Sequence, residues 1–247
     1  MKRIVIVGAT SVIAGHCARC WARDGAAQLT LIGRDRPGLE HLAIELRTLG
    51  PEVSAQTLVV DFIDPVAIAD VVDQYAAGGA PDIVLIAHGA RPEQEACQAD
   101  LTVCRDALMI NAISPALFAE AFAFHLALAK RGRLALIGSV TGDRGRKSNY
   151  VYGAAKGLLA RLAEGMQHRF AGTKVKVVLI KPGPTDTPMS AHLHGSGKTL
   201  AAPDAVGRGI VAAIERGAAT VYLPGKWRWI MGVVRHIPAA LFNRFNL

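Results

Sequence analysis

Short apolar runs alternate with longer helical patterns along most of this 247-residue chain. The runs are near-continuous in Val, Ile and Leu, which is typical of strands covered by helices on both faces. They span residues 3–7, 28–32, 53–59, 82–86, 133–137, 176–180 and 220–223. Helical patterns fall near 11–25, 36–49, 65–77, 98–130, 150–171 and 203–216. This alternation predicts an α/β fold, a doubly wound domain built on a parallel sheet.

The composition is that of a folded globular chain, with 51% apolar and 19% charged residues. No Pro- or Gly-rich linker divides it, so we expect one domain over 1–225 and a basic, apolar extension of that domain over 226–247. The first residues lack the apolar core and cleavage site of a signal peptide. No unbroken run of about 20 apolar residues is found. With four cysteines that fit a reducing compartment, we expect a cytoplasmic protein.

The cysteines and histidines do not form a metal-binding pattern. Cys17 and Cys20 make a C-x-x-C inside a helical stretch, with no second pair to complete a zinc site. We interpret them as packed side chains. His192 and His194 lack an evident third ligand, so no metal is expected.

The first apolar run leads into a turn of small residues between Gly8 and Gly15, and a helix follows. Small residues let the backbone approach a pyrophosphate, and the helix N-terminus offers unpaired N–H groups and a positive dipole end. A plain tight turn is the alternative, since Val12 and Ala14 stand where a strict fingerprint has glycine. The candidate cofactor-binding residues here are Gly8, Thr10, Ser11 and Ile13.

The second strand ends at Arg34, followed by Asp35. In a dinucleotide fold this end lies beside the adenosine ribose, where an arginine could pair with a 2′-phosphate. Arg34 therefore favours NADP(H) over NAD(H), with Asp35 pointing elsewhere; the alternative is a solvated surface arginine. Asp61 and Phe62 follow the third strand. Asp61 could accept from the adenine amino group or cap the next helix, although Asp64 before Pro65 is the better cap.

A second set of polar residues follows the fifth strand. Ser139 stands at its end, Tyr152 comes thirteen residues later, and Lys156 lies one helical turn beyond Tyr152 on the same face. An ammonium next to a phenol favours the phenolate and is expected to lower its pKa from about 10. The Ser139 hydroxyl could hold an oxygen on which negative charge develops. An ordinary buried tyrosine beside a surface lysine is the alternative.

Together these features resemble the short-chain dehydrogenase/reductase family over nearly the full length of the chain. The resemblance implies a Rossmann-type domain with a seven-stranded parallel sheet, and dimers or tetramers. It implies catalytic roles for Ser139, Tyr152 and Lys156, with Asn111 completing a proton relay through water. Tyr152 and Lys156 also count as cofactor contacts. The stretch 181–187 resembles the nicotinamide-side loop of the family, which adds the candidate contacts Pro182, Gly183, Thr185 and Thr187.

The chain departs from the family after the fourth strand, where Asn-Asn-Ala-Gly is usual. Here Ala87, His88 and Gly89 follow Ile86, so only the glycine is kept. The backbone of these three residues could still line a cofactor. His88 either replaces part of the missing side-chain brace or is simply a packed histidine.

The last 22 residues carry four basic and no acidic side chains in a chain of net charge +8. Their aromatic, basic and aliphatic residues suit a helix on anionic lipid, a wall of the substrate site or an oligomer contact. The segment 188–200 carries His192, His194 and Lys198, which could meet an anionic head group or do nothing specific. The whole combination is similar to the reductases of decaprenylphosphoryl-keto-pentose, a subgroup that acts on a lipid-linked keto-sugar.

We therefore expect an NADPH-dependent carbonyl reductase acting on a small-molecule or lipid-linked keto substrate. Two alternatives are an alcohol dehydrogenase running in the oxidative direction and a non-catalytic NADP-binding sensor or scaffold. No nucleic acid is expected, because the tail has few charges and no recognised motif. Expected partners are further copies of the chain, as a homo-dimer or homo-tetramer, and the inner face of a membrane, reached through the tail.

Overall fold

The computed structural model describes every residue except 26, 196, 198 and 245–247. Its strands are β1 (Lys2–Val7), β2 (Ala27–Gly33), β3 (Val53–Val59), β4 (Ile83–Ile86), β5 (Arg131–Ile137), β6 (Lys174–Pro182) and β7 (Thr220–Leu223). They form one seven-stranded sheet in the order β3-β2-β1-β4-β5-β6-β7, and each neighbouring pair is parallel. The predicted doubly wound fold with seven parallel strands is confirmed.

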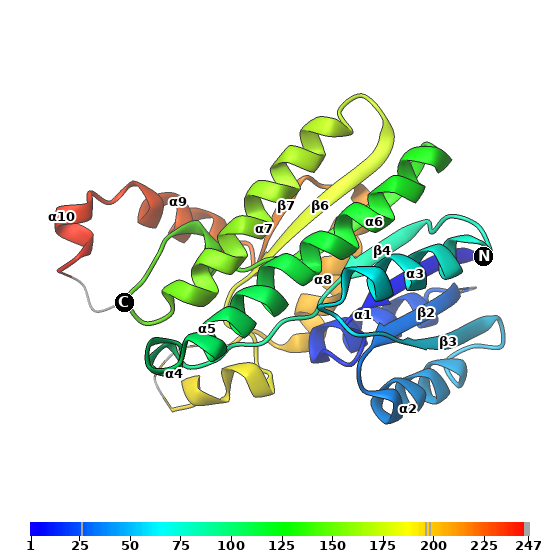
Figure 1. Ribbon diagram of the computed structural model, residues 1–247, viewed down its shortest axis with the longest axis horizontal. Helices are drawn as coiled ribbons and strands as arrows, with labels where there is room; N and C mark the ends of the chain where they lie inside the picture. Colours follow the sequence, from blue (N-terminus) through cyan, green and yellow to red (C-terminus); the bar gives the residue numbers. More distant parts are fainter. Residues whose placement is uncertain (26, 196, 198, 245–247) are drawn as a thin grey trace.

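Helices cover both faces of the sheet (Figure 1). They are α1 (Val12–Arg23), α2 (Arg36–Arg47), α3 (Pro65–Ala76), α4 (Gln94–Ala99), α5 (Leu101–Leu108), α6 (Ser114–Ala129), α7 (Tyr150–Arg169), α8 (Pro203–Arg216), α9 (Lys226–His236) and α10 (Ala239–Phe242). A π-helical turn, η1 (Met109–Ile113), and two 3₁₀ turns, η2 (Val140–Asp143) and η3 (Pro188–Leu193), complete the elements.

Strand β1 shows why the apolar runs are continuous. Ile4 and Ile6 pack into the core layer formed with α1, α2 and α8, whereas Val5 and Val7 pack into the layer formed with α3, α6 and α7. Successive side chains of a strand point to opposite faces, so a strand covered on both sides needs an apolar residue at every position. All four side chains are fully buried.

The sheet reverses its winding between β1 and β4, and the loops after these two strands meet there. The Ala87 amide donates to the Val7 carbonyl at 2.8 Å. Gly8 has a φ of +79°, and a Cβ at this position would lie 2.6 Å from the backbone nitrogen of His88. Glycine is therefore required at position 8 both by backbone conformation and by space. Ligands of open α/β sheets bind at this kind of switch point.

The helix predicted over 98–130 is divided in the structure. Asp100 separates α4 from α5, and its carboxylate accepts from the Thr102 amide at 2.7 Å. The stretch Leu101–Ala129 is long and apolar enough by composition to cross a membrane, yet half of its most apolar window is buried. Phe118 and Phe122 are fully buried in the core that α6 shares with the sheet. Its apolar character is thus that of a core helix.

The C-terminal segment is helical and docks on the loop that follows β5. The Arg144 guanidinium donates to the carbonyls of Val234, Arg235 and Ile237 at 3.2, 3.0 and 2.7 Å, which satisfies the open end of α9. It also lies 4.1 Å from the ring centroid of Phe242 in α10.

Candidate active site

Strand β5 delivers Ser139 to the carboxyl edge of the sheet. The Gly138 amide donates to the Ile180 carbonyl at 2.7 Å, so the pairing with β6 continues one residue beyond the end of β5. The Ser139 Oγ then accepts from the Thr141 amide at 3.2 Å and from the Thr141 hydroxyl at 2.8 Å. Both lone pairs of the Ser139 oxygen are thereby used, which leaves its O–H to donate into the site.

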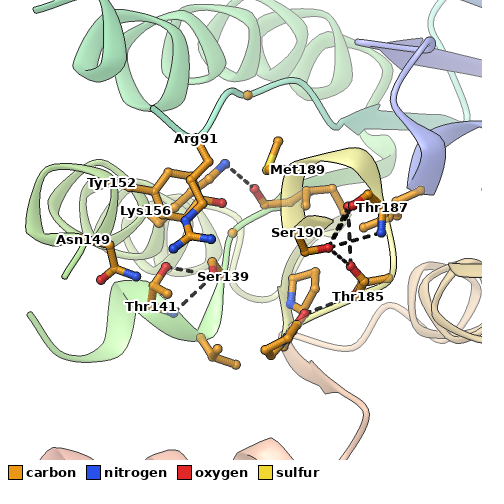
Figure 2. A pocket seen from close by; sticks show the side chains of 18 of the residues that line it. Arg91, Ser139, Thr141, Asn149, Tyr152, Lys156, Thr185, Thr187, Met189 and Ser190 are labelled. Carbon is orange, nitrogen blue, oxygen red and sulfur yellow. Dashed lines mark hydrogen bonds between the residues drawn. The ribbon is translucent and has the colours of Figure 1, made fainter. Parts of the chain in front are cut away.

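The first two turns of α7 bring Tyr152 and Lys156 to the same place (Figure 2). The Lys156 Nζ lies 5.8 Å from the centroid of the Tyr152 ring and donates to the Ile137 carbonyl at 3.0 Å. The spacing of four residues thus places both side chains on one helical face, as predicted.

Burial dominates the electrostatics of this pair. It raises the pKa of Tyr152 to about 12, against the opposing effects of the Arg91 charge and a hydrogen bond with Ser139. Burial also lowers the pKa of Lys156 to about 8. The expectation that Lys156 lowers the pKa of Tyr152 is therefore wrong, because desolvation of the phenolate outweighs the nearby charges. At neutral pH the phenol keeps its proton, which is the state that a proton donor needs.

Asn111 lies in the π-helical turn, fully buried. Its Nδ2 donates to the Ala107 carbonyl at 2.8 Å, and its Oδ1 accepts from the Ala90 amide at 3.0 Å. A Cβ on Gly89 would lie 2.7 Å from that Oδ1 and 3.5 Å from Lys156 Nζ. Asn111 thus fixes the loop after β4 against the helix and next to Lys156, and its part in a water relay stays a prediction.

His88 is both a packed histidine and a brace of the loop after β4, the two roles that its sequence context left open. Its ring packs 4.4 Å from the Phe62 ring and 5.6 Å from the Phe118 ring, centroid to centroid. Its Nε2 shares a hydrogen bond with the Ser114 hydroxyl at 2.8 Å. Burial, together with the charges of Lys156 and Arg34, lowers its pKa to about 3. His88 is therefore a packed, neutral histidine that also braces the β4 loop to α6.

These groups meet around one cavity (Figure 2). The predicted residues that line it are Ser11, Ile13, Ala87, His88, Gly89, Ser139, Tyr152, Lys156, Pro182, Gly183, Thr185 and Thr187. The predicted residues outside this lining are Gly8, Thr10, Arg34, Asp61, Phe62 and Asn111. The lining residues that sequence reasoning missed include Arg91, Thr141, Arg146, Asn149, Met189, Ser190, Leu193 and Trp227.

The start of α1 is suited to an anionic group. Ser11 precedes the helix and makes no side-chain cap, and the first turn holds no acidic residue. The Gly8 turn leads directly into this end. Unpaired N–H groups and the helix dipole attract phosphate oxygens. This end of the site therefore fits the pyrophosphate of a dinucleotide.

The ends of β2 and β3 carry the residues assigned to the adenosine side. The Arg34 guanidinium is exposed and lies 5.6 Å from the Phe62 ring centroid. The Asp35 carboxylate lies against Gly38 in the first turn of α2. The Asp61 Oδ1 accepts from the Ile63 amide at 3.0 Å and closes its own turn. Asp64 caps α3 by accepting from Val66, as predicted.

The opposite wall is formed by the segment after β6. The Ser190 hydroxyl binds the Thr185 carbonyl, and the Thr187 amide donates to Ser190 Oγ at 3.2 Å (Figure 2). His194 pairs with Asp186 at 2.8 Å, and Lys198 lies outside the described residues.

The tail contributes to the cavity through Trp227, the second residue of α9. A Cβ on Gly183 would overlap the indole Nε1 of Trp227. Trp227 thus lines the cavity, and the role of the tail among the three that were expected stays a prediction. No sequence motif marks Trp227; its signal is its place four residues after the end of β7.

Comparisons with known proteins agree with this geometry. The family model for short chain dehydrogenases matches residues 2–196. An uncharacterised oxidoreductase of Streptomyces coelicolor is 30% identical over 98% of this chain and 95% of its own length. The cis-4-hydroxycyclohexanecarboxylate dehydrogenase of Sinomonas cyclohexanicum is 30% identical over 83% of this chain and 82% of its own.

Among solved structures, the actinorhodin polyketide ketoreductase with NADPH has a TM-score of 0.78 at 20% identity, covering 90% of this chain and 95% of its own. That likeness concerns the fold. The family match covers most of the chain and contains the Ser139, Tyr152 and Lys156 site. This chain therefore belongs to the short-chain dehydrogenase family, as an NAD(P)-dependent oxidoreductase that acts on CH–OH or C=O groups.

Proposed function

We propose that the protein is an NADPH-dependent carbonyl reductase with Tyr152 as its proton donor. The observation that carries this proposal is the convergence of Ser139, Tyr152 and Lys156 on one cavity. The raised pKa of Tyr152, about 12, supports a donor rather than a base, since the phenol holds its proton throughout the neutral range.

The residues present fit the cofactor. The Gly8 turn and the start of α1 would hold the pyrophosphate, and Arg34 would pair with a 2′-phosphate. When bound, NADPH supplies hydride to the keto carbon. The NADPH in the related ketoreductase structure is consistent with this choice. Arg34 supports NADPH over NADH because Asp35, the acidic neighbour, is turned towards α2.

The chain's own groups perform the proton chemistry. The Ser139 O–H donates to the keto oxygen, where negative charge develops as the carbonyl is reduced. Tyr152 transfers its proton to that same oxygen and becomes a phenolate. The Lys156 ammonium, held by the Ile137 carbonyl, lies close enough to the ring to stabilise the phenolate that forms.

The same site can run in the oxidative direction, and one relative is named as a dehydrogenase of a hydroxy acid. Initial rates distinguish a reductase from a dehydrogenase. They are measured by nicotinamide absorbance, with NADPH or NADH and a panel of ketones, and with NADP⁺ or NAD⁺ and the matching alcohols. A reductase shows its highest kcat/KM with NADPH and a ketone. Tight NADPH binding without turnover of any ketone or alcohol would point to a sensor and contradict the proposal.

An apolar keto substrate is supported by the walls of the cavity, where Met189, Leu193 and Trp227 lie. The outward face of α9 exposes Trp229 at 77% and Val233 at 68%, in a segment without acidic residues. We infer peripheral contact of this face with an anionic membrane surface. Sedimentation with anionic and with neutral vesicles tests it. We expect the protein to sediment with the anionic vesicles and Trp229→Ser to weaken this binding. Protein that stays in the supernatant with both vesicle types contradicts the inference.

Self-association is proposed for the outer face of α6, where Phe124 is 57% and Leu128 66% exposed. Neighbouring apolar side chains on a surface commonly mark a protein interface. Light scattering should give the mass of a dimer or tetramer, and Leu128→Glu should lower it. A monomer at micromolar concentration contradicts this assignment.

A further inference from the structure

The cavity wall carries two arginines, Arg91 and Arg146, that the proton chemistry does not use. Among the described residues that line the cavity, Lys156 is the further cation and no Asp or Glu is present. None of the ion pairs in the described part of the chain includes either arginine. The site therefore concentrates positive charge around an apolar interior without an anion of its own.

Arg146 lies in the loop between η2 and α7, with its guanidinium turned towards α9. Its Nη2 faces the Met231 sulfur at 3.6 Å, a weak acceptor, and its buried Nε has no hydrogen-bond partner among the described residues. Asp143 is the carboxylate that acts on Arg146, but it already binds Lys181 and Tyr222. Arg146 lines the cavity, and the Met231 sulfur is a weak acceptor, so a ligand oxyanion would give its guanidinium a stronger one.

Arg91 approaches the reacting groups from the loop after β4. Figure 2 shows its guanidinium beside Tyr152 and Ser139. Its charge acts on the Tyr152 phenol, which places it within electrostatic reach of that hydroxyl. Its Nη1 contacts the His192 imidazole, 3.3 Å from Nδ1. A guanidinium has five N–H donors, so contact through this one nitrogen leaves capacity for an oxyanion.

The position of Arg146 assigns it to the substrate rather than to the cofactor. Its neighbour Met231 belongs to α9, on the opposite side of the molecule from β2 and β3, where Arg34 lies (Figure 1). Trp227 of the same helix lines the cavity. The α9 end is thus the part of the cavity left for the distal portion of a substrate whose ketone lies at Tyr152.

We propose that the protein selects keto substrates that carry an oxyanion, a carboxylate or a phosphate, bound by Arg146 and Arg91. This proposal rests on the proposed function and specifies the class of ketone that the reductase would take. Planar guanidinium groups bind carboxylates and phosphates through paired hydrogen bonds. The enclosed, partly apolar surroundings strengthen such bonds relative to water.

The test compares matched ketones in the full-length protein with NADPH. A series of keto acids of increasing chain length, with 4-oxocyclohexanecarboxylate as a cyclic member, is measured beside the carboxamide of each acid. A phosphate monoester of a hydroxyketone forms the third arm and distinguishes phosphate from carboxylate. The variants are Arg146→Met, which keeps an apolar side chain against Met231, and Arg91→Gln. Lys147→Gln, an exposed charge next to Arg146 outside the cavity lining, is the matched control.

Wild type and Lys147→Gln should prefer an anionic ketone over its carboxamide by about ten- to a hundredfold in kcat/KM, mainly through KM. Arg146→Met and Arg91→Gln should lose that preference, measured within each variant as the ratio of kcat/KM for the acid to kcat/KM for its carboxamide, so that any effect of the Arg91 charge on Tyr152 cancels. Equal rates with acid and amide in wild type, or an unchanged preference in both arginine variants, overturn the proposal. If wild type reduces no ketone, the proposed function fails instead, and calorimetry decides the anion site. Keto-acid binding that Arg146→Met abolishes supports the site, and equal binding by both proteins overturns it.

Discussion

The Lys156 ammonium donates a hydrogen bond to the Ile137 carbonyl, 3.0 Å away. This contact ties the first turns of α7, which carry Tyr152, to the end of β5, which leads into Ser139. One buried lysine thus sets both the distance between the two hydroxyl-bearing residues and the charge beside the phenol. We expect the loss of its proton to limit activity at high pH.

The pH dependence of the reaction should report Lys156. Burial lowers the pKa of its ammonium to about 8, so the charge is present below that pH and is lost as pH rises through it. With saturating NADPH, ketone reduction should fall above about pH 8. Lys156→Arg keeps the charge, since guanidinium stays protonated, and should move the falling limb to higher pH at a lower maximal rate. If activity of the Lys156→Arg variant falls at the same pH as that of wild type, a group other than Lys156 causes the fall.

His88 should make folding pH-dependent. Burial lowers its pKa from 6.5 to about 3. Between those values the unfolded chain binds a proton that the folded chain excludes. The contribution of neutral His88 to the free energy of unfolding is therefore complete above pH 6.5. It declines by about 1.4 kcal/mol per pH unit as the pH falls towards 3. His88→Asn has no titrating group at this position. The difference in the free energy of unfolding between wild type and His88→Asn, measured by urea unfolding, should therefore be about 2 kcal/mol smaller at pH 5 than at pH 7. A constant gap contradicts the assignment.

The buried pair Lys181 and Asp143 should be important for stability. Their side chains are 6% and 2% exposed, and the Tyr222 hydroxyl donates to the second carboxylate oxygen at 2.7 Å. Lys181→Met leaves a buried carboxylate without its counter-ion and should cost about 3–5 kcal/mol in urea unfolding. Tyr222→Phe should cost about 1 kcal/mol. The exposed Lys176 on the same strand is the control, since Lys176→Met should stay within about 0.5 kcal/mol of wild type. A Lys181→Met protein as stable as that control contradicts the prediction.

Gly183 should be required because Trp227 packs directly on it. Gly183→Ala places a Cβ on the indole and should displace the start of α9, at a cost of about 1–3 kcal/mol. The melting temperature should fall and KM for the ketone should rise. Trp227→Ala in the Gly183→Ala background should recover part of the lost stability, as expected for contacting residues. Additive losses in the double variant would mean that the two side chains do not meet.

The fold could be predicted because its strongest signal is local. Continuous Val, Ile and Leu runs and the pairing of Asp64 with Pro65 each follow from the requirements of one element. The continuous apolar pattern predicts one long helix, although Asp100 and Pro115 mark the starts of α5 and α6. The π-helical turn at Asn111 depends on contacts with Ala90 and Ala107, which a periodicity pattern does not contain.

The site was predictable only where a motif fixed the spacing. Ser139, Tyr152 and Lys156 lie at set distances along the chain, and the structure brings them together. Arg91, Arg146 and Trp227 reach the same cavity from three separate segments, and their convergence depends on tertiary packing. The direction of the Tyr152 pKa shift also could not be derived from spacing, since it depends on how deeply the phenol is buried.

The proposed reduction depends on Tyr152 as the proton donor, and Tyr152→Phe tests this role most directly because only the hydroxyl is removed. Single-turnover reduction of a ketone by bound NADPH should slow by about a hundred- to ten-thousandfold, with the Kd for NADPH within about twofold of wild type. Tyr150→Phe, an exposed phenol two residues earlier on α7, should react like wild type. A Tyr152→Phe protein that reduces the ketone at the wild-type rate would contradict the central claim.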